Sequence, residues 1–219
     1  MNNIQEPTGY LALPASGLGP GILVLHAWWG LNDTIKDVCE RLAGEGYVAY
    51  APDLFNGRTA ATIAAAENLS GEADSQSEAN FVKIASAVDY LWERAQPRDG
   101  GLGVVGFSFG AYYALQLSGR DPERVRAVAL FYGCGDGDFD KAQATYLGHF
   151  AENDPYEPAE NVDWLENELR ANGRAATFYR YEGVGHWFFE PDRPDAYDET
   201  AANLAWKRTI SFLRENLSL

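Results

Sequence analysis

Apolar runs of strand length recur along nearly the whole chain. The run from Gly21 to Trp29 (GILVLHAWW) is continuously apolar and rich in Ile, Leu and Val, which is typical of a parallel strand buried on both faces. Similar but shorter runs are bounded by glycine, proline or polar residues. The further strands predicted from these runs cover residues 47–51, 102–107, 125–132, 146–151 and 175–181.

Segments with helical spacing separate these strands. Between residues 77 and 96, the spacing of Phe81, Val88 and Leu91 places apolar side chains on one helix face. The other predicted helices run from residue 32 or 33 to 44 and over residues 108–118, 159–172 and 195–216, and residues 55–75 are interpreted as a loop with a short helix.

The alternation of strands and helices predicts an α/β protein. Such an order favours a mostly parallel central sheet with right-handed connections and helices on both faces. The chain of 219 residues has no internal repeat and no interdomain linker. We therefore expect a single domain over residues 1–219.

Charge and cysteine usage narrow the kinds of partner and location. The chain has 32 acidic and 17 basic residues, a formal net charge of −15 that repels nucleic acid and anionic membranes. The apolar runs are too short to span a membrane, and the N-terminal residues lack the pattern of a signal peptide. Two distant cysteines, Cys39 and Cys134, do not indicate a disulfide framework. We expect a cytoplasmic protein, monomeric or a small homo-oligomer, that acts on a small molecule.

The motif with the most specific chemical meaning is G-x-S-x-G at residues 106–110 (GFSFG). It follows the apolar strand 102–107 and opens a helix, which is the setting of a nucleophile elbow. The tight turn strains the serine backbone and lifts its hydroxyl above the carboxyl ends of the strands. Ser108 is therefore the candidate nucleophile.

A serine nucleophile needs a base, and the chain has three histidines. His186 lies in a glycine-rich loop after the last predicted strand, from where it can reach over the sheet edge. We interpret His149 as a core or rim residue. His26 is expected beside the oxyanion hole, with direct substrate contact as an alternative. His186 is the predicted base.

The base needs a carboxylate that orients it. Asp154 follows the strand 146–151 and completes the order Ser, Asp, His of an α/β-hydrolase. Asp136, Asp138 and Glu152 are the alternatives for this role.

Backbone N–H groups are expected to bind the oxyanion. One belongs to Phe109, directly after the nucleophile, and the other to Trp28, with Ala27 as the alternative. Side chains at or near the predicted loops are candidates for the substrate pocket: His26, Ala27, Trp29, Phe55, Arg58, Tyr132, Trp187 and Phe188. No metal or cofactor is expected, because the histidines and cysteines lack ligand spacing and no dinucleotide motif is present.

These segments together resemble the dienelactone hydrolase family over nearly the whole chain. The resemblance rests on residues 26–32, 50–55, 106–110, 152–154 and 181–186. It implies a compact α/β-hydrolase without a large lid, and it supports Asp154 as the acid.

Two departures from the family pattern concern the nucleophile and the substrate. The best-known members have cysteine in place of Ser108 and glutamate in place of Ala27, so this chain looks like a serine-type relative. The family's lactone enzymes bind a substrate carboxylate with two arginines. Arg58 lies near the first of these positions, whereas the second holds Glu190, with Arg193 nearby. The acidic residue argues against the same anionic lactone.

The sequence therefore predicts a hydrolase of small carboxylic esters or lactones. Ser108, His186 and Asp154 would form its catalytic triad and an acyl-enzyme its intermediate. The alternatives are a catalytically silent member of the fold that binds a small hydrophobic ligand, and another triad enzyme such as an acyltransferase.

Overall fold

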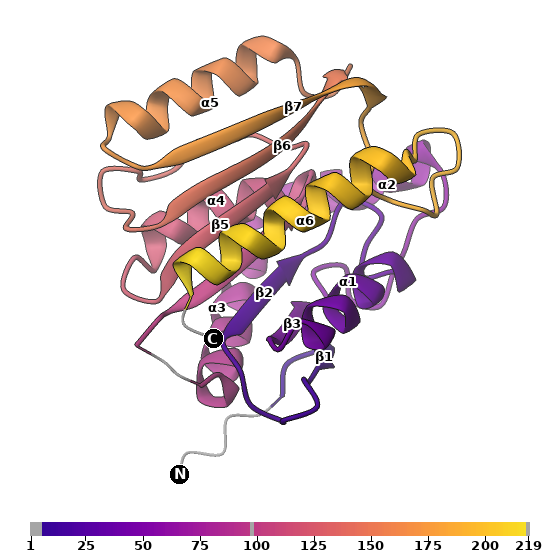
Figure 1. The fold of residues 1–219 in the computed structure, drawn as a ribbon. Helices are drawn as coiled ribbons and strands as arrows, with labels where there is room; N and C mark the ends of the chain where they lie inside the picture. Colours follow the sequence, from indigo (N-terminus) through magenta and orange to yellow (C-terminus); the bar gives the residue numbers. More distant parts are fainter. Residues whose placement is uncertain (1–5, 97–98, 218–219) are drawn as a thin grey trace.

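The computed structural model describes residues 6–96 and 99–217, and within them it has one seven-stranded sheet in the order β1-β3-β2-β4-β5-β6-β7 (Figure 1). Only β1 is antiparallel to its neighbour, and it lies at the edge beside β3. The predicted α/β class with a mostly parallel sheet is thus confirmed. The strands are β1 (Gly9–Ala12), β2 (Gly21–Leu25), β3 (Val48–Pro52), β4 (Leu102–Phe107), β5 (Val125–Phe131), β6 (Thr145–Asn153) and β7 (Ala176–Gly185).

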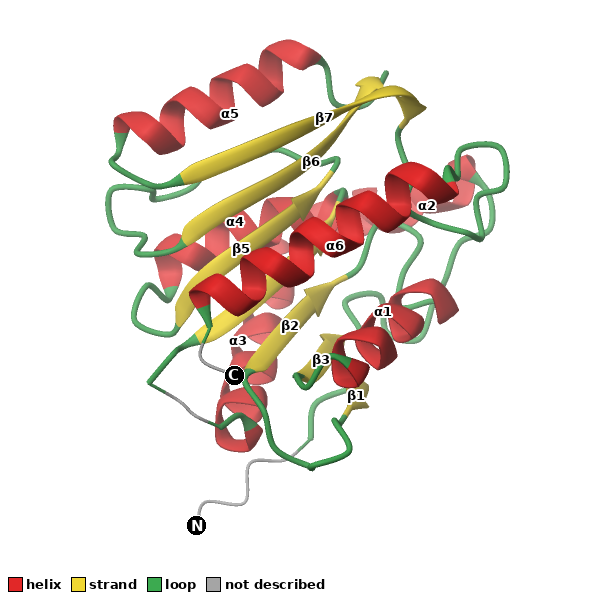
Figure 2. Ribbon diagram, in the orientation of Figure 1, coloured by secondary structure: helices red, strands yellow, loops and turns green. Residues whose placement is uncertain are grey.

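Helices cover both faces of the sheet, as the strand–helix alternation predicts (Figure 2). In this view α1 and α6 lie in front of the sheet, and α3 and α4 lie behind it. No helix of the described residues is both long and apolar enough to cross a membrane. The helices are α1 (Asp33–Gly44), α2 (Ile63–Asp74), α3 (Ser77–Arg94), α4 (Phe109–Arg120), α5 (Ala159–Ala171) and α6 (Glu199–Asn216).

Several predicted boundaries are wrong by a few residues. β2 ends at Leu25 rather than Trp29, because the chain turns where the Gly30 N–H donates to the Ala27 carbonyl at 3.1 Å. α6 begins at Glu199 rather than Asp195, because the Asp198 side chain caps it by accepting from the Ala201 N–H at 2.8 Å. β6 and β7 extend beyond the predicted ends, and the edge strand β1 is absent from the prediction.

A buried polar network in the core joins the last elements of the chain. His149 on β6 is fully buried, with its Nδ1 2.8 Å from the Tyr181 hydroxyl and its Nε2 2.9 Å from the Thr209 hydroxyl of α6. Burial lowers the pKa of His149 to about 3. His149 therefore connects α6 to β6 and β7 and lies away from the sheet edge.

The turn from β4 into α4 is tightly packed against the end of β2. A Cβ atom added to Gly110 would lie 2.2 Å from the Leu25 carbonyl oxygen and 2.7 Å from that of His26. Backbone atoms cannot give way as a flexible side chain can. Glycine at this position therefore lets the helix start close to the neighbouring strand.

This packing predicts that Gly110→Ala destabilises the fold. We expect a loss of about 1–3 kcal/mol in the free energy of unfolding, because the added methyl group overpacks backbone atoms. Gly71→Ala is the matched control, since Gly71 lies in α2 with no heavy atom within 4 Å of an added Cβ. Urea unfolding of both variants checks the prediction, and an equal effect of the two substitutions would contradict it.

Candidate active site

Ser108 lies on the tight turn between β4 and α4, in a strained backbone conformation. Its φ of 46° and ψ of −110° are rare for a residue with a side chain. The Ser108 N–H donates to the Phe131 carbonyl of β5 at 2.8 Å, and the Ser108 carbonyl accepts from the Ala111 N–H at 2.8 Å. The neighbouring strand and the first turn of α4 therefore hold the strained residue, as the elbow motif predicts.

The structure brings together the three side chains predicted to form a triad. The Ser108 Oγ lies 2.9 Å from His186 Nε2, and His186 Nδ1 lies 2.7 Å from Asp154 Oδ2. The side chains of His186 and Asp154 are 4% and 2% exposed. Both hydrogen bonds are thus shielded from competing water, and one ring connects the hydroxyl to the carboxylate.

Two backbone N–H groups fix the orientation of Asp154. Its Oδ1 accepts from Tyr156 N–H at 2.9 Å and from Glu157 N–H at 3.0 Å. This turn leaves Oδ2 directed at His186. A carboxylate held in this way selects the His186 tautomer that carries its proton on Nδ1 and leaves Nε2 free to accept from Ser108.

The alternative acids have other partners. Asp136 accepts from the Gln116 amide at 2.9 Å, Asp138 pairs with Lys141 at 2.9 Å, and the Glu152 carboxylate accepts from the Gly183 N–H at 2.8 Å. Within the described residues, none of these three contacts His186 by a hydrogen bond or ion pair.

The two predicted oxyanion donors lie on adjoining segments. Phe109 is the first residue of α4, where a backbone N–H has no acceptor within its own helix. Trp28 lies in the loop after β2, and its N–H donates to no acceptor in the described part of the chain. The close packing of Gly110 on Leu25 and His26 keeps the two segments together.

His26 connects two loops at this edge of the sheet. Its ring is fully buried, with Nδ1 2.7 Å from the Ala27 carbonyl, and Nε2 accepts from the Leu54 N–H at 3.2 Å. Burial lowers the pKa of His26 to about 4, which keeps the ring neutral at pH 7. Both ring nitrogens bind backbone groups, which favours the expected place beside the oxyanion hole over the alternative of direct substrate contact.

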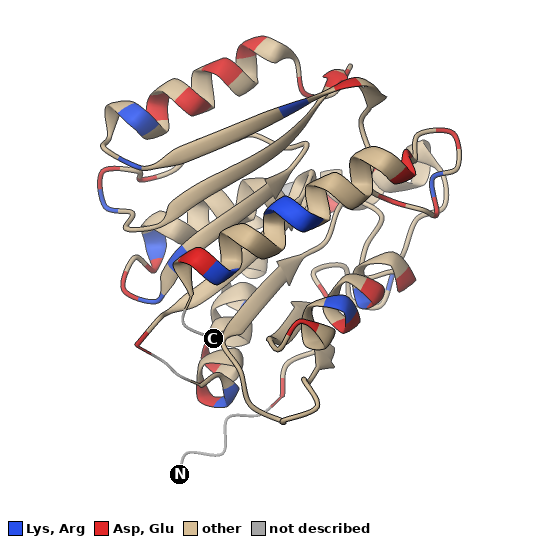
Figure 3. Cartoon of the chain, viewed as in Figure 1, with Lys and Arg blue, Asp and Glu red and all other residues tan. Residues whose placement is uncertain are grey.

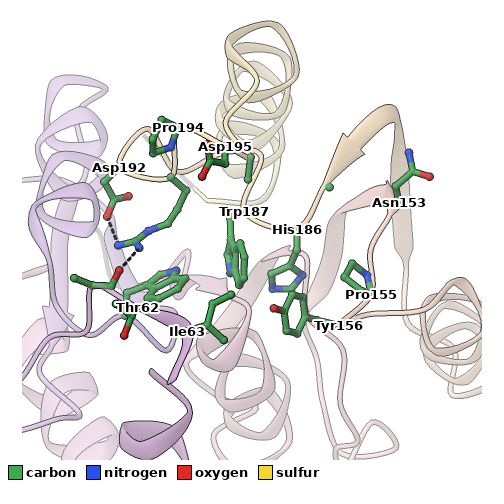
Figure 4. A pocket seen from close by; sticks show the side chains of 15 residues that line it. Thr62, Ile63, Asn153, Pro155, Tyr156, His186, Trp187, Asp192, Pro194 and Asp195 are labelled. Atoms are coloured by element: carbon green, nitrogen blue, oxygen red, sulfur yellow. Dashed lines mark hydrogen bonds and ion pairs between the residues drawn. The ribbon is translucent and has the colours of Figure 1, made fainter. Parts of the chain in front are cut away.

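A pocket of about 590 Å³ opens beside His186 (Figure 4). The loop that carries Asp192, Pro194 and Asp195 forms one side of it, and Asn153, Pro155 and Tyr156 lie on the other. It is lined by Trp29, Ala61, Thr62, Ile63, Asn153, Pro155, Tyr156, Gly185, His186, Trp187, Asp192, Arg193, Pro194, Asp195 and Ala196.

Only part of the predicted pocket set lines this pocket. Trp29 and Trp187 do. Arg58 lies elsewhere, paired with Glu72 at 2.7 Å, and it borders a separate hollow with Asp53. The other predicted members do not line this pocket and are packed in the interior, at 1% exposure or less: His26, Ala27, Phe55, Tyr132 and Phe188.

Several lining residues were not predicted. Thr62 and Ile63 stand at the start of α2, and Asp192 and Asp195 belong to the turns before α6. The sequence Glu-Pro-Asp-Arg-Pro-Asp over residues 190–195 is a turn signal that could have marked this loop. Among the described residues, no group of three or more His, Cys, Asp or Glu could hold a metal ion.

A buried tyrosine–glutamate pair lies behind the histidine. The Tyr132 hydroxyl donates to Glu190 Oε1 at 2.7 Å, and the Tyr132 ring lies 4.8 Å from that of His186. Glu190 is 1% exposed and does not line the pocket, although the family resemblance aligns it with an arginine that binds substrate. Desolvation raises the pKa of Glu190 to about 8, because a buried carboxylate loses its hydration.

This chain is similar to proteins of one known family. The sequence profile of the dienelactone hydrolase family matches residues 8–217. This chain belongs to that family. It is 31% identical to "Protein usf" of Aquifex pyrophilus over 96% of this chain and 94% of the relative. It is also 31% identical to a "Putative carboxymethylenebutenolidase" of Aquifex aeolicus, over 95% and 93% of the two chains.

A solved structure shares the fold. The crystal structure titled "Putative Dienelactone Hydrolase" from Klebsiella pneumoniae superposes with a TM-score of 0.81 at 23% identity, covering 94% of this chain and 92% of that one. As a dienelactone hydrolase family member, the chain is a hydrolase for ester or lactone bonds with the α/β-hydrolase fold.

The buried Glu190 predicts a decline in stability at alkaline pH. Its pKa rises from an ordinary 4.5 to about 8 in the folded protein, so the folded chain holds this proton more tightly. Its stabilising contribution is complete below pH 4.5 and is lost as the pH rises through 8. Between pH 6.5 and 8, we expect Glu190→Gln to reduce the loss of unfolding free energy by about 1–2 kcal/mol in urea titrations.

The control for this prediction is Glu67→Gln, because Glu67 is exposed on α2. His26 and His149 are present in all the proteins compared, so the titration of their unfolded forms around the ordinary pKa of 6.5 contributes equally to each and cancels in the comparison. A Glu190→Gln variant with the same pH dependence as the unmodified protein would contradict the assignment.

Proposed function

We propose that the chain hydrolyses small carboxylic esters or lactones through a Ser108–His186–Asp154 triad. The observation that carries this proposal is the continuous hydrogen-bond chain from the serine hydroxyl through the imidazole to the buried carboxylate. Its supporting feature is the strained turn, which presents Ser108 at the end of β4. Such an arrangement activates a hydroxyl that is otherwise a weak nucleophile.

In the proposed first step, the Ser108 oxygen attacks the carbonyl carbon while His186 Nε2 takes its proton. The carbonyl oxygen becomes an oxyanion and accepts from the Phe109 and Trp28 N–H groups. Collapse of this intermediate breaks the ester bond, and His186 protonates the leaving oxygen. Asp154 stabilises the imidazolium that forms between these two proton transfers.

In the second step, water hydrolyses the acyl-enzyme. His186 Nε2 takes a proton from the water, whose oxygen attacks the acyl carbon. Return of the proton to the Ser108 oxygen releases the carboxylic acid and regenerates the serine. A lactone follows the same course, with its leaving alcohol and acid joined in one product.

The pocket favours short or aromatic acyl and alcohol groups. Trp29, Tyr156 and Trp187 line it together with Ile63, so flat apolar groups can stack there. The two cysteines are free, which is compatible with the cytoplasmic location that the sequence predicts.

The proposal predicts that Ser108 is the residue labelled by a fluorophosphonate probe. We expect the unmodified protein to react and Ser108→Ala to lose labelling and at least 10³-fold in ester turnover, since removing the serine of a triad costs on the order of 10⁶-fold in kcat. Unchanged labelling of the variant would eliminate Ser108 as nucleophile. Absence of labelling and turnover in the unmodified protein would favour a silent fold member that binds a ligand.

The role of Asp154 predicts a large loss of kcat in Asp154→Asn. The amide can no longer stabilise the imidazolium, and we expect kcat to fall by about 10⁴-fold in a p-nitrophenyl ester assay. Asp136→Asn is the matched control, because Asp136 binds Gln116 rather than histidine. Near-normal turnover of the Asp154 variant would refute this assignment.

A further inference from the structure

The pocket beside His186 carries carboxylates on the loop before α6. Asp195 is exposed there and makes no hydrogen bond or ion pair with any described residue. Asp192 also lines the pocket, and its side chain is 35% exposed. Figure 3 shows acidic residues on this loop between β7 and α6.

The arginine of the pocket is already neutralised. Arg193 donates to Asp192 at 2.9 Å and to the Ala61 carbonyl at 3.3 Å, and its guanidinium lies 3.8 Å above the Trp29 ring. Its Nε is buried. With Asp192 compensating Arg193, the carboxylate of Asp195 leaves the pocket with an excess of negative charge.

The aromatic residues present ring carbons to the pocket. Trp29 and Trp187 line it, yet the Nε1 atoms of both are buried from solvent. Tyr156 lies 5.0 Å from the Trp187 ring, and both rings lie 5.1 Å from His186. Electron-rich rings beside a carboxylate attract cations, and the two indoles offer an anion no exposed N–H group.

We propose that this pocket binds a cationic group, such as a substituted ammonium, carried by the ester substrate. The proposal rests on the proposed esterase function, since the group would extend from the bond attacked by Ser108 past His186. Cation–π contact with Trp187 and Tyr156 and attraction to Asp195 would hold it. The net charge of −15 adds long-range attraction for the same substrates.

Two matched phenols test the charge preference directly. (3-Hydroxyphenyl)trimethylammonium and 3-tert-butylphenol have the same shape and differ by a charged nitrogen in place of carbon. We expect calorimetric titration to give a Kd about tenfold lower for the ammonium compound, with the difference shrinking as NaCl is added. Competition with p-nitrophenyl acetate hydrolysis should give the same order of Ki values.

Single substitutions test whether Asp195 and Trp187 cause the preference for the ammonium compound. Asp195→Asn and Trp187→Leu should each reduce the preference at least threefold. Glu123→Gln, which removes the same charge from an exposed residue before the amino end of β5, should leave it unchanged. Equal or tighter binding of 3-tert-butylphenol, or an equal loss in the Glu123 variant, would overturn the proposal.

The experiment separates this inference from the proposed function. Ser108-dependent hydrolysis of p-nitrophenyl acetate without any ammonium preference would overturn the cation site and leave the esterase proposal intact. Because calorimetry measures binding without turnover, ammonium preference in a protein that hydrolyses no ester would support the site and overturn the esterase proposal.

Discussion

The sharp turn between β4 and α4 is the constraint on which the rest of the site depends. It requires Ser108 to adopt a positive φ, and it requires glycine where the helix passes within contact distance of β2. The positive φ of Ser108 and the close approach of the helix to β2 both cost free energy unless neighbouring segments compensate them. The hydrogen bond from the Ser108 N–H to β5 and the packing of Gly110 on β2 compensate the strain from both sides. Ser108 is therefore positioned by two neighbouring strands rather than by its own segment.

The parallel sheet explains how residues from distant segments meet at that turn. Strands that run in one direction place their following loops at the same edge. Asp154 follows β6 and His186 follows β7, while Trp28 follows β2. Each loop brings one group, and the buried His149 network keeps the last two strands and α6 together beneath it. A rigid sheet thus orients side chains that a flexible chain could hold only at a large entropic cost.

The pocket is built mostly outside this rigid part of the structure. The pocket walls come from the start of α2 and from the turns before α6, both outside the sheet. Loops of this kind can change their side chains without disturbing the strands. The buried Glu190 and the exposed Asp195 illustrate the difference: one belongs to the packing behind His186, the other to the exposed wall of the pocket. Charge in the pocket is therefore set by residues that the sheet does not require.

The sequence by itself determined the α/β class, the elbow and the identity of the three residues that meet there. Each of these follows from a pattern in the sequence. Strand periodicity and a glycine-flanked serine are local patterns, and the order Ser, Asp, His is given by the strand that each residue follows. Only the tertiary structure decided which side chains face the pocket. Phe55 and Phe188 are apolar loop residues like Trp29 and Trp187, yet only the latter two line it. Exposure depends on which distant segments pack against a residue, and local sequence does not encode that packing.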